Sequence, residues 1–169
     1  VVSDNMIPTG DTSQEITITP KGKNEAEFYN KDVEVSVHVV DAPNNDNYAG
    51  LKSVTYTVGK DGNATQANVS MYSNEASVLS LDQIRSSQKY SDDKLIINAA
   101  QNESNHAYIA VTATDHAGNT VTTTKELKID VTKPEIEISF DTDAAQNERY
   151  YNTNRVARID IKELNFDPN

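Results

Sequence analysis

Residues 108–138, YIAVTATDHAGNTVTTTKELKIDVTKPEIEI, decide the fold of this chain. Two segments of alternating apolar and polar residues, 107–114 and 120–130, flank the polar turn DHAGN at 115–119. A period of two predicts β-strands with one buried face, and Gly118 suits a turn that needs positive φ. Pro134 then marks a short link before another alternating segment begins at 135. We therefore expect one β-domain to end near residue 131 and another to begin near 132.

Alternation of the same kind recurs upstream of this stretch. Val33, Val35, Val37 and Val39 alternate with polar residues, which predicts a strand with four buried valines. Ser80 and Gln83 form a capping-box pattern that predicts one short helix over 81–87. Shorter strands are expected at 16–19 (ended by Pro20), at 51–59, at the sheet edge over 67–72, and at 95–97. About seven strands with regular turns predict a two-sheet β-sandwich, and no helical period supports a βαβ unit.

The composition excludes several classes of function. The chain has 26 Asp+Glu against 15 Lys+Arg, a net charge of −11, which opposes binding to nucleic acid or to an anionic membrane surface. Its apolar runs are too short for membrane insertion, and with 0 Cys no disulfide or cysteine-metal site can form. The first residue is Val1 and no leader pattern follows it, so we expect the chain to be part of a longer protein.

Two distant segments share one order of features. FYNKDVEVSVHVVDA at 28–42 matches YYNTNRVARIDIKEL at 150–164, and ITI at 16–18 matches IEI at 136–138. This internal repeat predicts that a second copy of the domain begins near 132 and contains only its first two strands. Two strands cannot bury an apolar face alone. We therefore expect 135–164 to be covered by the first domain, by another chain, or through strand exchange with another chain.

TATDHAGN at 112–119, IDVTKPEIEI at 129–138 and YYNTNRVARIDIKELNF at 150–166 resemble tandem bacterial Ig-like domains of Gram-positive (Firmicutes) cell-surface and secreted proteins. The resemblance covers most of 13–169, although 41–106 matches no motif and has long loops. It implies an Ig-like sandwich with one short helix, an extracellular location, secreted or attached to the cell wall, and a role as spacer, adhesive domain or accessory domain.

Candidate sites are few in this sequence. His38 lies on the polar face of a strand, and His106 and His116 are expected in a loop and a turn, without a nucleophile or ligand pattern near them. We therefore expect no enzymatic activity, no catalytic residues and no cofactor. The oxygen-rich loops 41–47 and 115–119 and Asp130 suit calcium, but Asp and Asn also make such turns without an ion, and we favour the turn interpretation.

Two further kinds of site are compatible with these residue types. Lys52 and Lys125 lie on expected strands and are candidates for a Lys–Asn cross-link of the kind known in similar modules, but alternation predicts outer faces for both. A sugar-binding platform could be built from tyrosines, although half-buried rings in a sandwich are the more common role. The tyrosines in question are Tyr29, Tyr48, Tyr72, Tyr90, Tyr108, Tyr150 and Tyr151.

The domain prediction is a linker over 1–12, an Ig-like β-sandwich over 13–131, and the first strands of a second, incomplete Ig-like module over 132–169. The function expected is that of a non-catalytic extracellular module in a tandem array, acting as a stalk or adhesion domain of a bacterial surface protein. Its partners would be neighbouring modules of the same chain and possible protein or glycan ligands. The alternative is a carbohydrate-binding accessory module of a large secreted hydrolase.

Overall fold

The computed structural model describes residues 14–44, 48–141 and 154–163, which belong to two compact units, 1–131 and 132–169. Strands make up most of the described residues, as the alternating sequence predicts. The predicted linker 1–12 lies outside the described residues.

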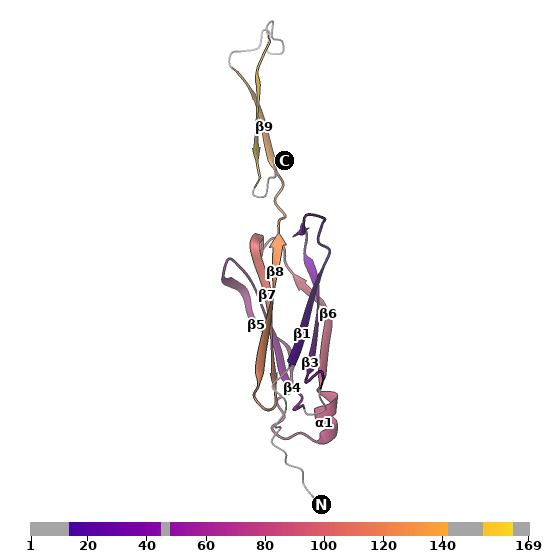
Figure 1. Ribbon diagram of the computed structural model, residues 1–169. Helices are drawn as coiled ribbons and strands as arrows, with labels where there is room; N and C mark the ends of the chain where they lie inside the picture. Colours follow the sequence, from indigo (N-terminus) through magenta and orange to yellow (C-terminus); the bar gives the residue numbers. More distant parts are fainter. Residues whose placement is uncertain (1–13, 45–47, 142–153, 164–169) are drawn as a thin grey trace, which may run out of the picture. The chain divides into compact units, whose positions relative to one another are not determined.

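The first unit contains two β-sheets (Figure 1). The three-stranded sheet has the order β1-β3-β6 and contains β1 (Gln14–Lys21), β3 (Val33–Asp41) and β6 (Lys89–Ile97). The five-stranded sheet has the order β2-β8-β7-β4-β5 and contains β2 (Phe28–Tyr29), β4 (Leu51–Lys60), β5 (Asn63–Ser73), β7 (Ser104–Asp115) and β8 (Thr120–Ile129). Neighbouring strands are antiparallel except β2, which runs parallel to β8.

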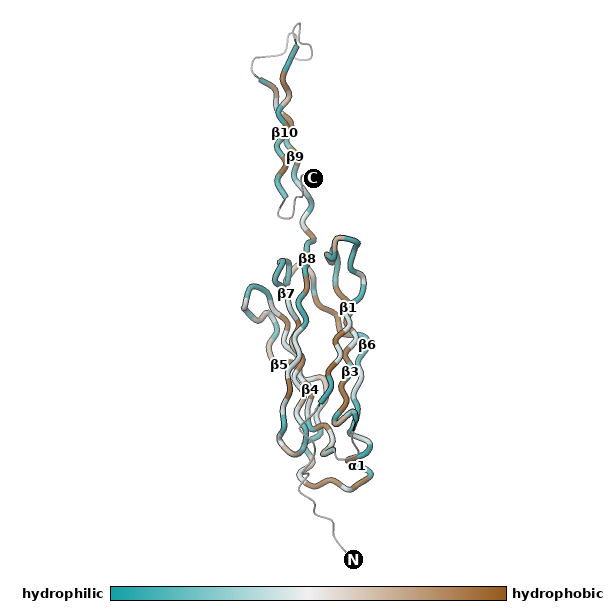
Figure 2. Tube along the Cα trace, viewed as in Figure 1, coloured by the Kyte–Doolittle hydropathy of each residue, from teal (hydrophilic) through white to brown (hydrophobic). Residues whose placement is uncertain are grey.

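The two sheets pack face to face around one hydrophobic core, which confirms the predicted sandwich. The four alternating valines of β3, at 33, 35, 37 and 39, are 0% exposed, and so are Ile109, Val111 and Ala113 of β7. The hydrophobic residues of β3 appear as brown segments in Figure 2. Burial of four valines on one side of a strand specifies its register, because a shift of one residue would move all four to the opposite face.

Three strands extend further than the sequence predicted. β5 begins at Asn63 instead of Ala67, because the tight turn at Asp61 and Gly62, both with positive φ, starts the pairing with β4 at once. β6 begins at Lys89 instead of Leu95, since its polar first half pairs with β3. β1 continues through Pro20, a residue tolerated there because β1 is an edge strand.

A single helix is found among the described residues, α1 (Leu81–Ser86), in the connection between β5 and β6. The Ser80 hydroxyl accepts a hydrogen bond from the Gln83 N–H, and the Gln83 side chain accepts one from the Ser80 N–H. This confirms the predicted capping box. The helix ends at the C-cap residue Ser87, whose backbone N–H donates to the carbonyls of Gln83 and Ile84.

The second unit contains one antiparallel pair, β9 (Glu135–Phe140) and β10 (Ala157–Lys162). Ile136 pairs with Ile161, and Ile138 pairs with Ile159. In the first unit Ile16 pairs with Val39 and Ile18 with Val37. The offsets are constant, 136 − 16 = 138 − 18 = 120 on one strand and 161 − 39 = 159 − 37 = 122 on the other. The pairing of β9 with β10 thus repeats that of β1 with β3, residue for residue.

The isoleucines of this strand pair are exposed. Ile136, Ile138, Ile159 and Ile161 are 63%, 60%, 60% and 42% exposed, whereas Val37 and Val39 are fully buried. No second sheet faces β9 and β10 among the residues of this unit that the structure describes. The described residues of this unit therefore form a two-stranded pair without a second layer. The matching tyrosines Tyr150 and Tyr151 and the end of the predicted segment at 164 lie outside the described residues.

Candidate functional site

His38 lies in a line with a serine and an aspartate on the outer face of the three-stranded sheet. Its Nδ1 is 2.8 Å from the Ser91 Oγ, and its Nε2 is 3.3 Å from the Asp93 Oδ1. The three types match a hydrolase triad, and the sequence did not reveal the group because more than fifty residues separate His38 from Ser91. The imidazole and the carboxylate are 45% and 61% exposed, so water reaches the whole group. Acyl transfer depends on oxyanion donors in a site shielded from water. The contacts instead join β3 to β6 as cross-strand pairs.

The other two histidines occupy different environments. His106 is exposed and lies within β7, not in a loop, because pairing with β8 extends that strand back to Ser104. His116 is in the predicted turn, where its backbone N–H donates to the Gly50 carbonyl at 3.0 Å. Burial first, and the Lys52 ammonium second, lower the pKa of His116. The imidazole is therefore neutral at pH 7 and serves to pack the turn.

Two buried aspartates meet at the end of the sandwich where β3 and β7 terminate. Asp41 and Asp115 are both 0% exposed, and the Gln14 amide nitrogen reaches both carboxylates, at 3.4 and 3.2 Å. Burial raises the pKa of Asp41, while the hydrogen bond from the Gly50 N–H to its Oδ2, at 2.8 Å, opposes that rise. Asp115 accepts both the backbone and the side-chain N–H of Asn119, each at 2.8 Å.

This arrangement corresponds to the turn interpretation of the oxygen-rich loops, because backbone and amide N–H groups already bond to the two carboxylates. The structure brings Asp41 and Asp115 together but not Asp130, which lies beyond the far end of β8. Ten residues of strand at about 3.3 Å each place it about 30 Å away. Across the described ranges no three Asp, Glu or His side chains converge as metal ligands. Part of the loop considered for calcium, 45–47, lies outside those ranges.

The tyrosines do not form one platform. Tyr29 is buried, while Tyr72 of β5 and Tyr90 of β6 pack against each other with ring centroids 5.6 Å apart. This contact joins the edge strands of the two sheets and belongs to the margin of the core. Tyr48 and Tyr108 are half-buried. Half-buried rings of this kind are the structural role that the sequence favoured.

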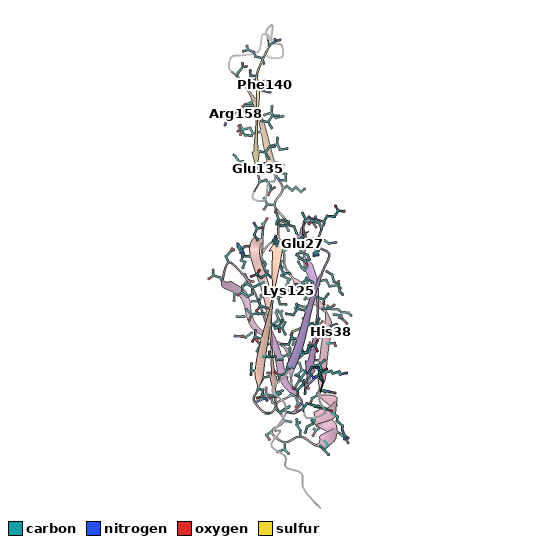
Figure 3. All side chains as sticks on the ribbon, viewed as in Figure 1. Glu27, His38, Lys125, Glu135, Phe140 and Arg158 are labelled. Carbon is teal, nitrogen blue, oxygen red and sulfur yellow. The ribbon has the colours of Figure 1, made fainter. Side chains whose placement is uncertain are left out.

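The two lysines considered for a cross-link lie on outer surfaces, as predicted. Lys125 is exposed on β8 (Figure 3), and the Lys52 ammonium is 3.9 Å from the Glu75 carboxylate with 45% of its side chain exposed. A Lys–Asn bond of the expected kind needs a buried lysine beside a buried acid, and neither side chain provides that environment.

A cleft lies at the opposite end of the first unit from the paired aspartates, where β8 terminates. Its volume is about 160 Å³, and its buried residues are Tyr29 and Leu127, 6% and 3% exposed. Exposed polar side chains surround these two: Lys23, Glu27, Asn105, Lys125, Glu126 and Lys128. Three lysines thus gather around one small cleft in a strongly acidic chain. Sequence reasoning missed this group because β8 supplies two of the lysines and the loop between β1 and β2 supplies the third.

Comparison of the chain with protein-family models, with curated proteins and with solved structures found no match. Within the described ranges no helix is long and apolar enough to cross a membrane; α1 has only 6 residues. The functional proposals that follow rest on the geometry of the chain itself.

Proposed function

We propose that the chain is a non-catalytic, extracellular spacer or adhesion module from a tandem array of Ig-like domains. The sheet topology supports the Ig-like assignment. In chain order β1, β3, β4, β5, β6, β7 and β8 take the places of strands A, B, C, C′, E, F and G, with A-B-E in one sheet and G-F-C-C′ in the other. Helix α1 occupies the connection between C′ and E.

The observation that carries the spacer role is the direction in which the chain passes through the first unit. Gln14, at the start of β1, contacts the two aspartates at one end of the sandwich. Ile129, the last residue of β8, pairs with Tyr29 of β2 at the other end. The described chain therefore begins at one end of the unit and leaves at the opposite end. Units connected in this way form a row. Tension along the row pulls parallel to the strands, so the backbone hydrogen bonds between paired strands are loaded together rather than broken one at a time.

The repeated strand pair supports the array. β9 and β10 have the register of β1 and β3, and their exposed isoleucines match residues that the five-stranded sheet covers in the first unit. A second sheet of the same kind is the cover that fits this face. The link at 130–134 contains Pro134, which fixes its own φ and favours an extended conformation at Lys133. Such a link limits bending between units, and the acidic surface disfavours association with anionic neighbours.

Single-molecule force spectroscopy tests this proposal. With handles attached before Gln14 and after Ile129, the first unit should unfold in one step. The 116 residues from 14 to 129, at about 3.5 Å each and less a folded length of about 40 Å, predict a gain of about 370 Å. Unfolding of the first unit in several smaller steps, or without a measurable force peak, would contradict the role of a mechanical spacer.

A carbohydrate-binding accessory module is the second candidate, and the lysine-rimmed cleft favours it. A glycan array separates the candidates, because a pure spacer binds none of the sugars. Both candidate functions are non-enzymatic. The solvent exposure of the Ser91–His38–Asp93 group supports this part of the proposal. Assay of the chain with activated esters, with His38→Ala as the control, would reveal any hydrolysis by that group.

A further inference from the structure

The cleft beside the end of β8 is electropositive over a short range. Lys23, Lys125 and Lys128 bring three positive charges, against two from Glu27 and Glu126. The net charge of −11 is spread over the whole chain, and at physiological ionic strength charges are largely screened beyond about 8 Å. A small anion at the cleft therefore experiences the nearby lysines more strongly than the distant carboxylates.

The carboxylate of Glu27 belongs to this cluster. The Glu27 Oε1 is 2.7 Å from the Lys23 Nζ, and this ion pair lowers the pKa of Glu27, with smaller contributions from Lys128 and Lys125. Figure 3 labels Glu27 and Lys125 at this part of the first unit. All three ammonium groups thus favour a negative charge at the position of the Glu27 carboxylate, and Lys23 contacts it directly.

Glu27 holds this position through an unfavourable backbone conformation. Its φ is +69°, in the left-handed region that residues with a Cβ rarely adopt. The turn is stabilised by Asn24, whose carbonyl accepts the Glu27 N–H at 3.0 Å and whose Oδ1 accepts the Phe28 N–H at 2.8 Å. The Glu27 side chain is 65% exposed, so water can replace the ion pair when the carboxylate turns away.

Two of the lysines are free to bind another anion. The ion pairs formed within the described residues include neither Lys125 nor Lys128. The Lys128 ammonium lies 5.8 Å from the centre of the Phe28 ring, a cation–π contact that limits its conformations. The Asn105 side chain also lines this cleft.

The volume limits the size of the ligand. About 160 Å³ corresponds to about five water molecules at about 30 Å³ each, and it is below the usual range for drug-sized ligands. One six-membered ring fits this space, while a peptide segment does not. Tyr29 and Leu127 line the cleft but are only 6% and 3% exposed, so a ligand meets mainly the polar side chains around them, which suit the hydroxyl groups of a sugar ring.

We propose that this cleft binds one acidic sugar residue of the uronic-acid type, whose carboxylate lies between Lys125 and Lys128 and displaces the carboxylate of Glu27. Glu27 then acts as an internal competitor that weakens binding until a ligand replaces it. The inference depends on the first unit alone and rests on the second candidate function, the carbohydrate-binding module, since a pure spacer binds no sugar. Its failure would leave the result of the force experiment unaffected.

Titration of the ¹⁵N-labelled chain with glucuronate, followed by NMR, tests the site. We expect saturable shifts of the amides of Tyr29, Asn105 and Leu127, with a Kd on the order of 1 mM for a ligand of this size. The double variant Lys125→Ala/Lys128→Ala should weaken binding about tenfold or more, because exposed ion pairs contribute up to about fivefold each. Glu27→Gln should strengthen binding about two- to fivefold, since it removes the competing carboxylate.

Lys89→Ala is the matched control, an exposed lysine on β6 that does not line the cleft, and it should leave the affinity unchanged. Glucose and acetate are the control ligands, since each offers only the ring or only the carboxylate. Equal shifts with glucose would overturn the role of the lysines, and equal affinity for acetate would overturn the role of the ring. Weaker binding by Glu27→Gln, or unchanged binding by the double variant, would overturn the proposal as a whole.

Discussion

Ile96 and Ile97 are neighbours in β6 with opposite environments, and substituting each with alanine tests the packing of the sandwich. Ile97 is 1% exposed and belongs to the core, whereas Ile96 is 51% exposed on the outer face. The two variants share the residue type, the strand and the loss of β-propensity. A difference between them therefore measures burial alone.

The expected magnitude follows from the atoms removed. Ile→Ala deletes three carbons, worth about 0.8 kcal/mol each when fully buried, or about 2.4 kcal/mol. The cavity left behind at Ile97 adds to this, so a loss of about 3–4 kcal/mol is expected, within the usual range for such core substitutions. At Ile96 half of the side chain is already in water, and about 1 kcal/mol is expected.

Urea denaturation followed by circular dichroism measures both free energies of unfolding. With an m-value of about 2 kcal/mol/M, Ile97→Ala should lower the midpoint by about 1.5–2 M and Ile96→Ala by about 0.5 M. Equal losses would show that the faces of β6 are not distinct. A larger loss at Ile96 would indicate a register shifted by one residue and would refute the sandwich described for the first unit.

Three further predictions concern the end of the sandwich near Asp41 and α1. Gly50→Ala should lower the free energy of unfolding, measured by urea denaturation, by about 2–4 kcal/mol, because Gly50 has φ +82° and an added Cβ would clash with the Ser87 hydroxyl. Gly62→Ala is the comparison: its φ is +79° but the space around it is open, so the loss should be only about 1 kcal/mol. Burial raises the pKa of Asp41, so the folded state binds the carboxyl proton more tightly than the unfolded state does. The stability gained from this tighter proton binding is fully present below about pH 3.9, and it is lost as pH rises through the raised pKa. Relative to the wild type, Asp41→Asn should therefore gain stability between about pH 3 and pH 7, and a difference that does not change with pH would contradict the shift. Ser80→Ala should destabilise the unit by about 1 kcal/mol through loss of the helix cap, and an unchanged urea midpoint would show that the cap adds no stability.

The cleft shows where sequence reasoning ends. Lys125 and Lys128 are three residues apart on one strand, so alternation predicts opposite faces for their side chains, yet both line the cleft. Lys23 joins them only because β2 pairs with the end of β8 and brings the preceding loop to that position. Pairing between segments about a hundred residues apart depends on the folded topology, which local periodicity does not specify.

The sequence alone determined the strands with buried faces, because side chains alternate across a strand and Val33 to Val39 and Ile109 to Ala113 show this alternation directly. It also determined the helix cap at Ser80 and the turn at Gly118, where the needed geometry depends on only a few adjacent residues. Only the tertiary structure decided which strands are neighbours, how far the polar β5 and β6 extend, and that Gln14 connects Asp41 with Asp115. These features depend on contacts between distant segments, whose free energy is gained only when the whole sandwich has closed.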